Sequence, residues 1–294
     1  MLADLSGPLL AQTITTGILW GLMYALIALG LTVIFGVMEI CNFAHGDFLM
    51  TSMFVAYVCS LPLLGLNALQ SLPINIVFMF LMGIIIYRIL IKPVINAPPL
   101  AQIFSTFGLL VFLRGLAQFI FTADYHSLEK LAVAGRVELL GAFLPKPQVA
   151  AALGAMIMFA AVYFFIMKTK TGWALLAVAE NKQAAALMGI DSNKMFALAW
   201  GVGAACVSVA GALLANFYYV FPEVGAIFGF LSFVTVALGG FGSIQGAFWA
   251  GLIIGMTESL AGTLIAPSFK YLVVFVIFLL VVLIRPRGLM GHAS

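Results

Sequence analysis

VAAALGAMIMFAAVYFFIM, at residues 149–167, is a run of nineteen residues without a charged side chain. A helix rises about 1.5 Å per residue, so this run would reach roughly 28 Å, close to the thickness of the hydrocarbon core of a bilayer. Further uncharged runs are each long enough for at least one such helix: residues 5–38, 48–87, 195–222 and 224–257. The pattern predicts a chain that crosses a membrane repeatedly.

The composition excludes a soluble protein. Of the 294 residues, 64% are hydrophobic and 8% are charged, whereas charged residues make up about 25% of an average soluble chain. This deficit extends along the whole chain, so lipid must cover most of the surface. We therefore expect an all-α polytopic membrane protein with eight or nine membrane segments, organised as a single transmembrane domain over residues 1–294.

Lysine and arginine residues gather in three places, and positively charged loops stay on the cytoplasmic side of a membrane. Arg88 and Lys92 follow one apolar run, residues 168–194 carry four lysines, and two arginines follow the last run. We expect these three regions, and with them the C-terminus, to be cytoplasmic. The loop at residues 122–146 has balanced charges, so we expect it on the opposite face, while the side of the N-terminus stays open.

Polar residues interrupt the apolar pattern in VMEICNFAHGDFLM, at residues 37–50. Within nine residues this stretch places four polar or ionisable side chains and a glycine: Glu39, Asn42, His45, Gly46 and Asp47. An ionisable side chain at membrane depth costs on the order of 2.5–3.5 kcal/mol, so it needs a protein partner or water. We expect the stretch to break a membrane helix beside a solute pathway; a short loop at the membrane surface is the alternative for part of it.

A second irregular stretch, ALGGFGSIQGAFWAG at residues 237–251, is rich in glycine. Each glycine weakens a helix by up to about 1 kcal/mol relative to alanine, which predicts a helix break beside the same pathway at Gly239, Gly240, Gly242 and Gly246. Glycines also permit close packing of membrane helices, and that interpretation stays open.

Short apolar segments accompany both irregular stretches. Residues 48–60 and 224–238 are fifteen residues or fewer, short of the roughly 20 that a full membrane helix needs. Unwound backbone is tolerated at membrane depth only where protein buries it or water reaches it. Paired short segments in the two halves of a chain therefore indicate a transport pathway between them.

The segment at residues 168–194 is too short and too polar at its ends to span a membrane. Its Ala- and Leu-rich part predicts one helix over residues 173–188, closed by Gly189, because glycine commonly follows a helix C-terminus. Such a helix either fits a groove of a soluble partner or lies in the headgroup region of the bilayer.

Motifs in a fixed order connect the chain to a known family. GLMYALIALGLTVIFGV (residues 21–37) followed by NFAHGDFLM (42–50) resembles the opening of the LivH-type permeases of branched-chain amino acid ABC importers. TGWALLAVAENKQAAALMGID (171–191) resembles their cytoplasmic coupling stretch, and the glycine-rich stretch followed by RPRGLMG (285–291) completes the order. The resemblance covers nearly the whole chain. The family also includes permeases for urea and short amides, so the cargo stays open.

The resemblance implies which residues couple the permease to its energy source. Four residues follow the loose pattern of an importer's coupling loop: Glu180, Ala184, Ala185 and Gly189. Trp173 belongs to the same group, although relatives commonly carry arginine at its position and at that of Leu176. The coupling helix of this chain is therefore expected to be more apolar than theirs.

The resemblance also implies partners. It predicts a bacterial inner-membrane permease that pairs with a LivM-like sister permease, two ATP-binding subunits and a periplasmic solute-binding protein. The chain has no GxxxxGK(S/T) phosphate-binding loop, so we expect a non-catalytic subunit without a cofactor of its own, with ATP and Mg²⁺ on the partner subunits. The mechanism expected for such an assembly is alternating access.

Several side chains carry more specific expectations. His45 and Asp47 are expected to pair, and the pair either holds the break in shape, the role that we favour for His45, or meets a polar solute. Glu258 either faces the pathway or bonds a neighbouring helix. Arg114 either pairs with an internal acid or extends to the membrane surface. Cys41 and His45 share a spacing that suits metal ligands, but no second pair accompanies them, so we expect no metal site. We also expect no nucleic-acid partner.

Two rival functions stay open at this point. A self-sufficient secondary transporter or channel would use Glu39, Asp47 or Glu258 to couple to an ion gradient. A membrane scaffold without a transport role would not need the polar stretch for uptake of any solute.

Overall fold

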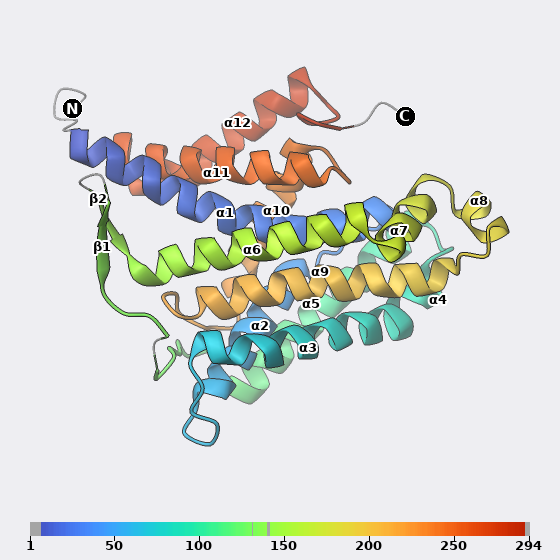
Figure 1. The fold of residues 1–294 in the computed structure, drawn as a ribbon, viewed down its shortest axis with the longest axis horizontal. Helices are drawn as coiled ribbons and strands as arrows, with labels where there is room; N and C mark the ends of the chain where they lie inside the picture. Colours follow the sequence, from blue (N-terminus) through green and yellow to red (C-terminus); the bar gives the residue numbers. More distant parts are fainter. Residues whose placement is uncertain (1–6, 131, 140–141, 292–294) are drawn as a thin grey trace.

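The chain forms a bundle of membrane-length helices in a computed structural model that describes residues 7–130, 132–139 and 142–291 (Figure 1). In this part of the chain seven helices are long and apolar enough to cross a membrane: α1 (Gly7–Met38), Ala68–Val94, α5 (Pro99–Phe121), α6 (Lys146–Lys168), α9 (Ser192–Leu214), α11 (Ile244–Leu264) and Pro267–Ile284. Two helices of 16 residues join them, α2 (His45–Ser60) and α10 (Val224–Gly239). The prediction of an all-α polytopic membrane protein is confirmed.

Two of the long helices are compound, and short elements complete the fold. Ala68–Val94 consists of α3 (Ala68–Ile86), the π-helix η1 (Tyr87–Ile91) and α4 (Lys92–Val94), and Pro267–Ile284 consists of the 3₁₀ turn η2 (Pro267–Phe269) and α12 (Lys270–Ile284). The remaining elements are β1 (Arg136–Leu139), its antiparallel partner β2 (Ala142–Pro145), α7 (Lys170–Glu180) and α8 (Lys182–Leu187).

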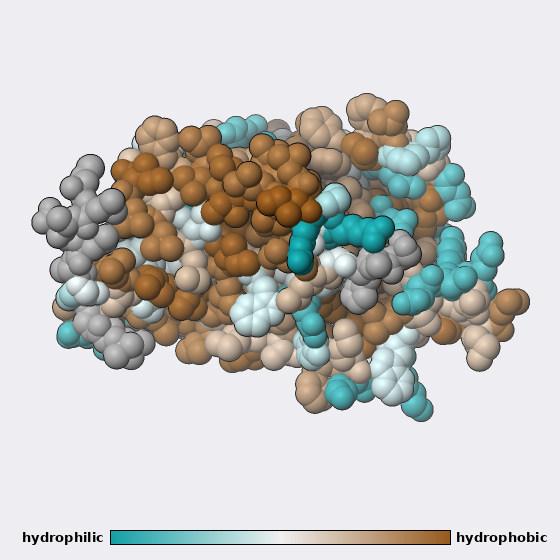
Figure 2. Space-filling model, turned by 90° about the horizontal axis from the view of Figure 1, so that it is seen from above, coloured by the Kyte–Doolittle hydropathy of each residue, from teal (hydrophilic) through white to brown (hydrophobic). Residues whose placement is uncertain are grey.

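The two ends of the described chain lie at opposite ends of the bundle (Figure 1). α1 begins beside the β hairpin, where Gln12 and the backbone of Phe143 exchange two hydrogen bonds. The C-terminal segment lies at the other end, together with α7 and α8. Figure 2 shows a broad apolar band over the middle of the molecule, while polar side chains gather toward the end with the C-terminal segment.

Close glycine contacts join the helices around the centre. Gly17 and Gly21 of α1 lie against Gly251 and Gly255 of α11, and a Cβ added at any of these four positions would meet backbone atoms of the other helix. In each pair the glycines are four positions apart, the spacing of small residues that lets membrane helices approach closely. α9 lies in the interior of the bundle, where 94% of its most apolar stretch of 18 residues is buried.

The expected single helix over residues 173–188 is in fact two helices. α7 ends at Glu180, and α8 begins at Lys182 because the Asn181 side chain accepts a hydrogen bond from the N–H of Ala184, 2.9 Å away, as an N-cap. Asparagine is among the strongest N-cap residues, and this local bond replaces continuation of the first helix. Gly189 has a φ of +80°, as expected for the residue that closes a helix.

Candidate functional site

Glu39 ends the first helix and does not join the buried polar groups. Its N–H donates to the carbonyl O of Phe35 at 2.7 Å, its φ is +57°, and its side chain is exposed. A non-glycine residue in the left-handed region is uncommon and typically closes a helix. The expectation that Glu39 lines an internal pathway is not supported by this position.

The next residues turn back into the bundle. His45, the first residue of α2, has its Nε2 2.8 Å from the carbonyl O of Ile27, in the middle of α1. Ile27 precedes the end of α1 at Met38 by eleven residues, which is about 16 Å along the helix axis. Asn42 helps to start α2, since its Oδ1 accepts a hydrogen bond from the N–H of Ala44. α2 therefore begins at depth, as the polar stretch predicted.

Asp47 pairs with a different partner from the one expected. Both Nε and Nη2 of Arg114 on α5 lie 3.2 Å from Oδ1 of Asp47. The expectation of a His45–Asp47 pair was wrong, because successive side chains of α2 point in different directions and the imidazole of His45 faces α1 instead. For Arg114, pairing with an internal acid is the alternative that the structure supports.

α5 also holds the irregular segment at a second point. The hydroxyl of Thr106 donates to the carbonyl O of Cys41 at 3.1 Å, and Thr106 is fully buried. No sequence signal distinguished Thr106, whereas Arg114 could be noticed as a lone cation inside an apolar run. α5 thus stabilises both the turn at residues 39–44 and the first turn of α2.

The two short helices begin against one another. A Cβ added at Gly46, in the first turn of α2, would overlap the carbonyl O of Gly225 and lie 2.7 Å from the Cα of Gly229, both on α10. Helix N-termini carry partial positive charge, and discontinuous membrane helices use such ends around anionic solutes. Sequence reasoning missed Gly225 and Gly229, because it sought the second break at the other end of α10.

The glycine-rich stretch is a turn between helices at the end of the bundle that carries α7 and α8. α10 ends at Gly239 and α11 begins at Ile244; between them Gly240 and Gly242 have φ values of +103° and +78°. Gly246 lies in the first turn of α11, where its N–H donates to the hydroxyl of Ser243. The predicted helix break at these glycines is confirmed, but it is a turn at the end of the bundle, where the glycines reverse the chain after α10.

Two of the sequence motifs meet at this turn. The N–H groups of Leu289 and Met290, in the RPRGLMG motif, donate to the carbonyl O atoms of Leu238 and Gly239 at 2.8 and 2.9 Å. These bonds satisfy carbonyl groups that the end of α10 would otherwise leave free. The C-terminal motif is thus a cap for α10.

Glu258 bonds neighbouring helices. The hydroxyl of Tyr24 on α1 donates to its Oε2 at 2.5 Å, and Nζ of Lys270 on α12 lies 2.6 Å from its Oε1. Of the two expected roles for Glu258, bonding a neighbouring helix is the one that the structure supports.

The predicted coupling residues lie together at the end with the C-terminal segment. Trp173 is exposed and donates from Nε1 to the carbonyl O of Met167, while Ala185 packs into the fold and Glu180 and Ala184 are exposed. Beyond them, Leu187 and Met188 are 89% and 82% exposed. α8 therefore presents an apolar tip, which we define as Leu187 and Met188.

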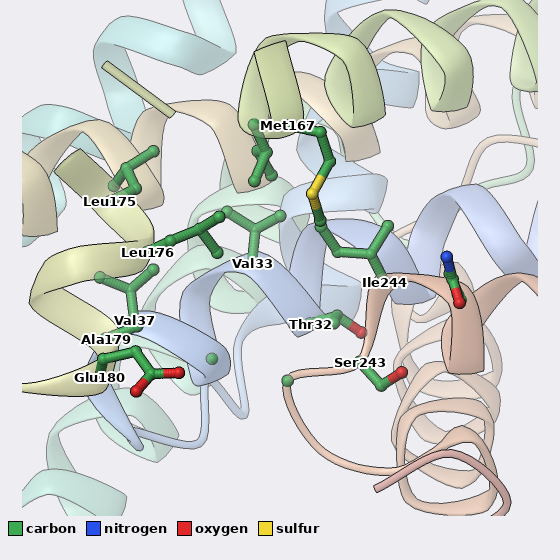
Figure 3. Close-up of a pocket in the computed structure, with 14 residues that line it drawn as sticks. Thr32, Val33, Val37, Met167, Leu175, Leu176, Ala179, Glu180, Ser243 and Ile244 are labelled. Carbon is green, nitrogen blue, oxygen red and sulfur yellow. The ribbon is translucent and has the colours of Figure 1, made fainter. Parts of the chain in front are cut away.

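A cavity of about 480 Å³ adjoins α7 (Figure 3). Its lining comes from α1, the α6–α7 junction and the start of α11: Thr32, Val33, Gly36, Val37, Ile166, Met167, Leu175, Leu176, Ala179, Glu180, Gly242, Ser243, Ile244 and Gln245. The cavity therefore joins the predicted coupling helix to the glycine turn and to the last turns of α1. Within the described residues no three His, Cys, Asp or Glu side chains cluster as metal ligands.

Comparisons with known proteins identify the family of the chain. Residues 13–282 match the family described as "branched-chain amino acid transport system / permease component". The permease protein LivH of a high-affinity branched-chain amino acid transport system from Escherichia coli K12 is 32% identical, over 96% of this chain and 95% of that protein. The corresponding protein BraD of Pseudomonas aeruginosa is 30% identical, with the same coverage of both chains.

More distant proteins match as well. A probable LivH of Methanocaldococcus jannaschii is 28% identical over 93% of this chain and 90% of that protein. A solved structure, PsaBC from Streptococcus pneumoniae in complex with Fab, aligns with a TM-score of 0.48 and 16% identity over 93% of this chain and 92% of that one. On the family match, which spans nearly the whole chain, and the identity to its curated relatives, this chain belongs to the permease components of branched-chain amino acid transport systems.

Proposed function

We propose that this chain is one of two permease subunits of an ATP-driven importer that carries branched-chain amino acids across the bacterial inner membrane. The observation that carries the proposal is the meeting of α2 and α10 at Gly46 and Gly225, inside the bundle and beside the buried Asp47, which pairs with Arg114. Interrupted helices with polar groups at depth are the usual elements of a solute pathway. The cargo class follows from the names of the relatives.

The expected partners are a sister permease, two ATP-binding subunits and a periplasmic solute-binding protein, and this chain itself is non-catalytic. The apolar tip of α8 supports the contact with an ATP-binding subunit, because two large side chains exposed beside a helix are typical of a segment that fills a groove on a partner. Basic residues support the orientation. Those on η1 and α4, at the end of α6 and in the C-terminal segment lie at the end of the bundle with α8, so we assign this end to the cytoplasm.

Alternating access can use the contacts of α7. Leu176 of α7 lies beside Val33 of α1 at the cavity that both residues line, and α1 leads directly into the polar segment (Figure 3). A displacement of α7 and α8 by ATP-driven closure of the partner subunits would therefore move the end of α1. Because Asn42, His45 and Asp47 are at most 1% exposed, opening the pathway requires α2 to move against α10 at their glycine contact.

Reconstitution tests this function. The chain, its sister permease and the ATP-binding subunits are placed in vesicles, and uptake of labelled leucine is measured with the solute-binding protein and ATP. We expect uptake only with ATP and all subunits, and no competition by excess urea or acetamide. Competition by these amides would favour the short-amide alternative, and uptake by the chain alone down an ion gradient would contradict the ATP-driven function.

A matched pair of variants tests the coupling. Replacing both residues of the apolar tip by serine (L187S and M188S) is expected to abolish co-purification of the ATP-binding subunits, because their groove loses its apolar occupant. The control is Leu63→Ser, since Leu63 is 94% exposed but lies in the loop between α2 and α3 at the opposite end. Equal co-purification of both variants would contradict the role of α8.

The structure offers no support for the ion-coupled rival. Glu39 is exposed at the end of α1, Asp47 is paired with Arg114, and Glu258 is paired with Lys270. None of these three acids is a buried, unpaired carboxylate that could bind a coupling ion.

A further inference from the structure

Two hollows with a shared lining residue adjoin α6 and α11. The cavity of Figure 3 forms the polar end, and a second hollow of about 470 Å³ lies farther along both helices, lined by Met156, Phe159, Ala160, Tyr163, Gln245, Phe248 and Trp249. Gln245 lines both parts. We name the two together the α6–α11 groove.

The second hollow is apolar and open to the membrane. The rings of Phe159 and Phe248 lie 5.1 Å apart in an edge-on arrangement and join its two walls, while Trp249 and Met156 are about half exposed. Met156 to Tyr163 spans roughly 10 Å along α6. Because α6 and α11 are membrane-length helices, this part of the groove faces acyl chains.

The polar end holds donors for an anion. The hydroxyl of Thr32 is buried without a hydrogen-bond partner, and Figure 3 shows it directed toward the start of α11. The first N–H groups of that helix, at Ile244 and Gln245, have no acceptor within the helix. A helix N-terminus together with a free hydroxyl group is a favourable site for a phosphate group.

The opposite wall of the same cavity carries a negative charge. Glu180, the last residue of α7, contributes the one carboxylate among the lining residues and forms no salt bridge with any described residue. A phosphate group alone would be repelled by Glu180, whereas a headgroup that carries an ammonium group beyond its phosphate satisfies both walls.

We propose that the α6–α11 groove binds a zwitterionic phospholipid with an ethanolamine headgroup, with its phosphate at the start of α11, its ammonium group toward Glu180 and an acyl chain over Phe159, Phe248 and Trp249. The order of the two parts favours a lipid over other occupants: the polar part lies at the end of the helices, and the aromatic part lies at bilayer depth. An anionic phospholipid such as phosphatidylglycerol lacks the ammonium group that would offset the repulsion between its phosphate and Glu180.

Quenching of tryptophan fluorescence tests this site without requiring any transport activity. The full transporter is placed in vesicles of phosphatidylcholine that contain a minor fraction of a lipid with brominated chains, either phosphatidylethanolamine or phosphatidylglycerol. The contribution of Trp249 is the difference between the unmodified protein and a Trp249→Phe variant, since the chain has three other tryptophans. We expect the ethanolamine lipid to bind about two- to fivefold more tightly at Trp249 than the glycerol lipid, the range of a partly exposed ion pair.

Variants separate the two ends of the headgroup. Glu180→Gln should remove the preference for ethanolamine, and Thr32→Val should weaken the binding of both lipids. Glu138→Gln, on the exposed strand β1 at the other end of the bundle, is the matched control and should leave the preference unchanged. Soluble glycerophosphoethanolamine should compete poorly, because it lacks the acyl chains.

Three results would overturn the proposal. Equal quenching by the two brominated lipids would mean that the groove only meets bulk lipid. Quenching of Trp249 in the isolated chain but not in the full transporter would mean that another subunit covers the groove. Strong competition by glycerophosphoethanolamine would mean that the acyl chain does not contribute.

Discussion

Two ion pairs lie within the membrane helices, and their surroundings differ. Asp47 pairs with Arg114 where α2 begins inside the bundle, and the side chains of Asp47 and Arg114 are 2% and 25% exposed. Glu258 pairs with Lys270 where α12 begins at the periphery, with side chains that are 11% and 34% exposed. Glu258 also accepts a hydrogen bond from Tyr24, whereas Asp47 has no second side-chain donor among the described residues.

The difference in surroundings gives the two ion pairs different roles. The Asp47–Arg114 pair joins the start of α2 to α5 at the place where α2 meets α10. Removal of one partner therefore leaves the other charge in an apolar interior. The Glu258–Lys270 pair joins α12 to α11 near an end of both helices, where Lys270 is partly exposed and Tyr24 is a second donor to Glu258. We infer that the first pair shapes the candidate pathway and that the second secures an outer helix.

The largest effect is expected from Arg114→Leu. It leaves the carboxylate of Asp47 buried without its partner, which should lower the free energy of unfolding by about 3–5 kcal/mol. Chemical unfolding of the purified chain in detergent measures the change. The double variant with Asp47→Leu should recover most of the loss, because no uncompensated charge remains; a double variant as unstable as the single one would contradict this account.

A smaller effect is expected from Gly46→Ala, beside the same pair. The added Cβ collides with Gly225 of α10, and overpacking of this kind costs about 1–3 kcal/mol. Leucine uptake should fall along with stability, because the contact between the two short helices is displaced. Gly108→Ala on α5 is the matched control, since a Cβ there meets no atom within 4 Å. Similar losses for both variants would remove the special role of the Gly46 contact.

The smallest effect is expected from Lys270→Met at the second pair. Glu258 keeps its bond to Tyr24, and the lost ion pair is partly exposed, so the free energy of unfolding should fall by about 1 kcal/mol or less. The same unfolding assay applies, with Lys130→Met in the loop before β1 as a control. A loss as large as that of Arg114→Leu would break the distinction between the two pairs.

Part of the candidate site could be predicted from the sequence, because single residues within apolar runs mark it. Asn42, His45 and Asp47 stood out as polar groups in an apolar run, and Gly189 predicted the end of a helix that the structure closes with a positive φ. Their partners could not be read in the same way. His45 and Asp47 lie two residues apart on α2 and therefore point in different directions. The rotation of α2 in the bundle decides which of them faces Arg114 on α5 and which faces α1.

Composition and the pattern of charges are enough to predict the membrane class, the two short helices and the polar group at depth, because hydrophobicity and charge act on each segment locally. The packing of the folded chain is needed to see that Gly46 meets Gly225, that the RPRGLMG motif caps α10, and that the glycine stretch is a turn at the end of the bundle. These contacts join residues far apart in the chain. They follow from the way in which α1, α2, α9, α10 and α11 pack, and that packing is a property of all the helices together.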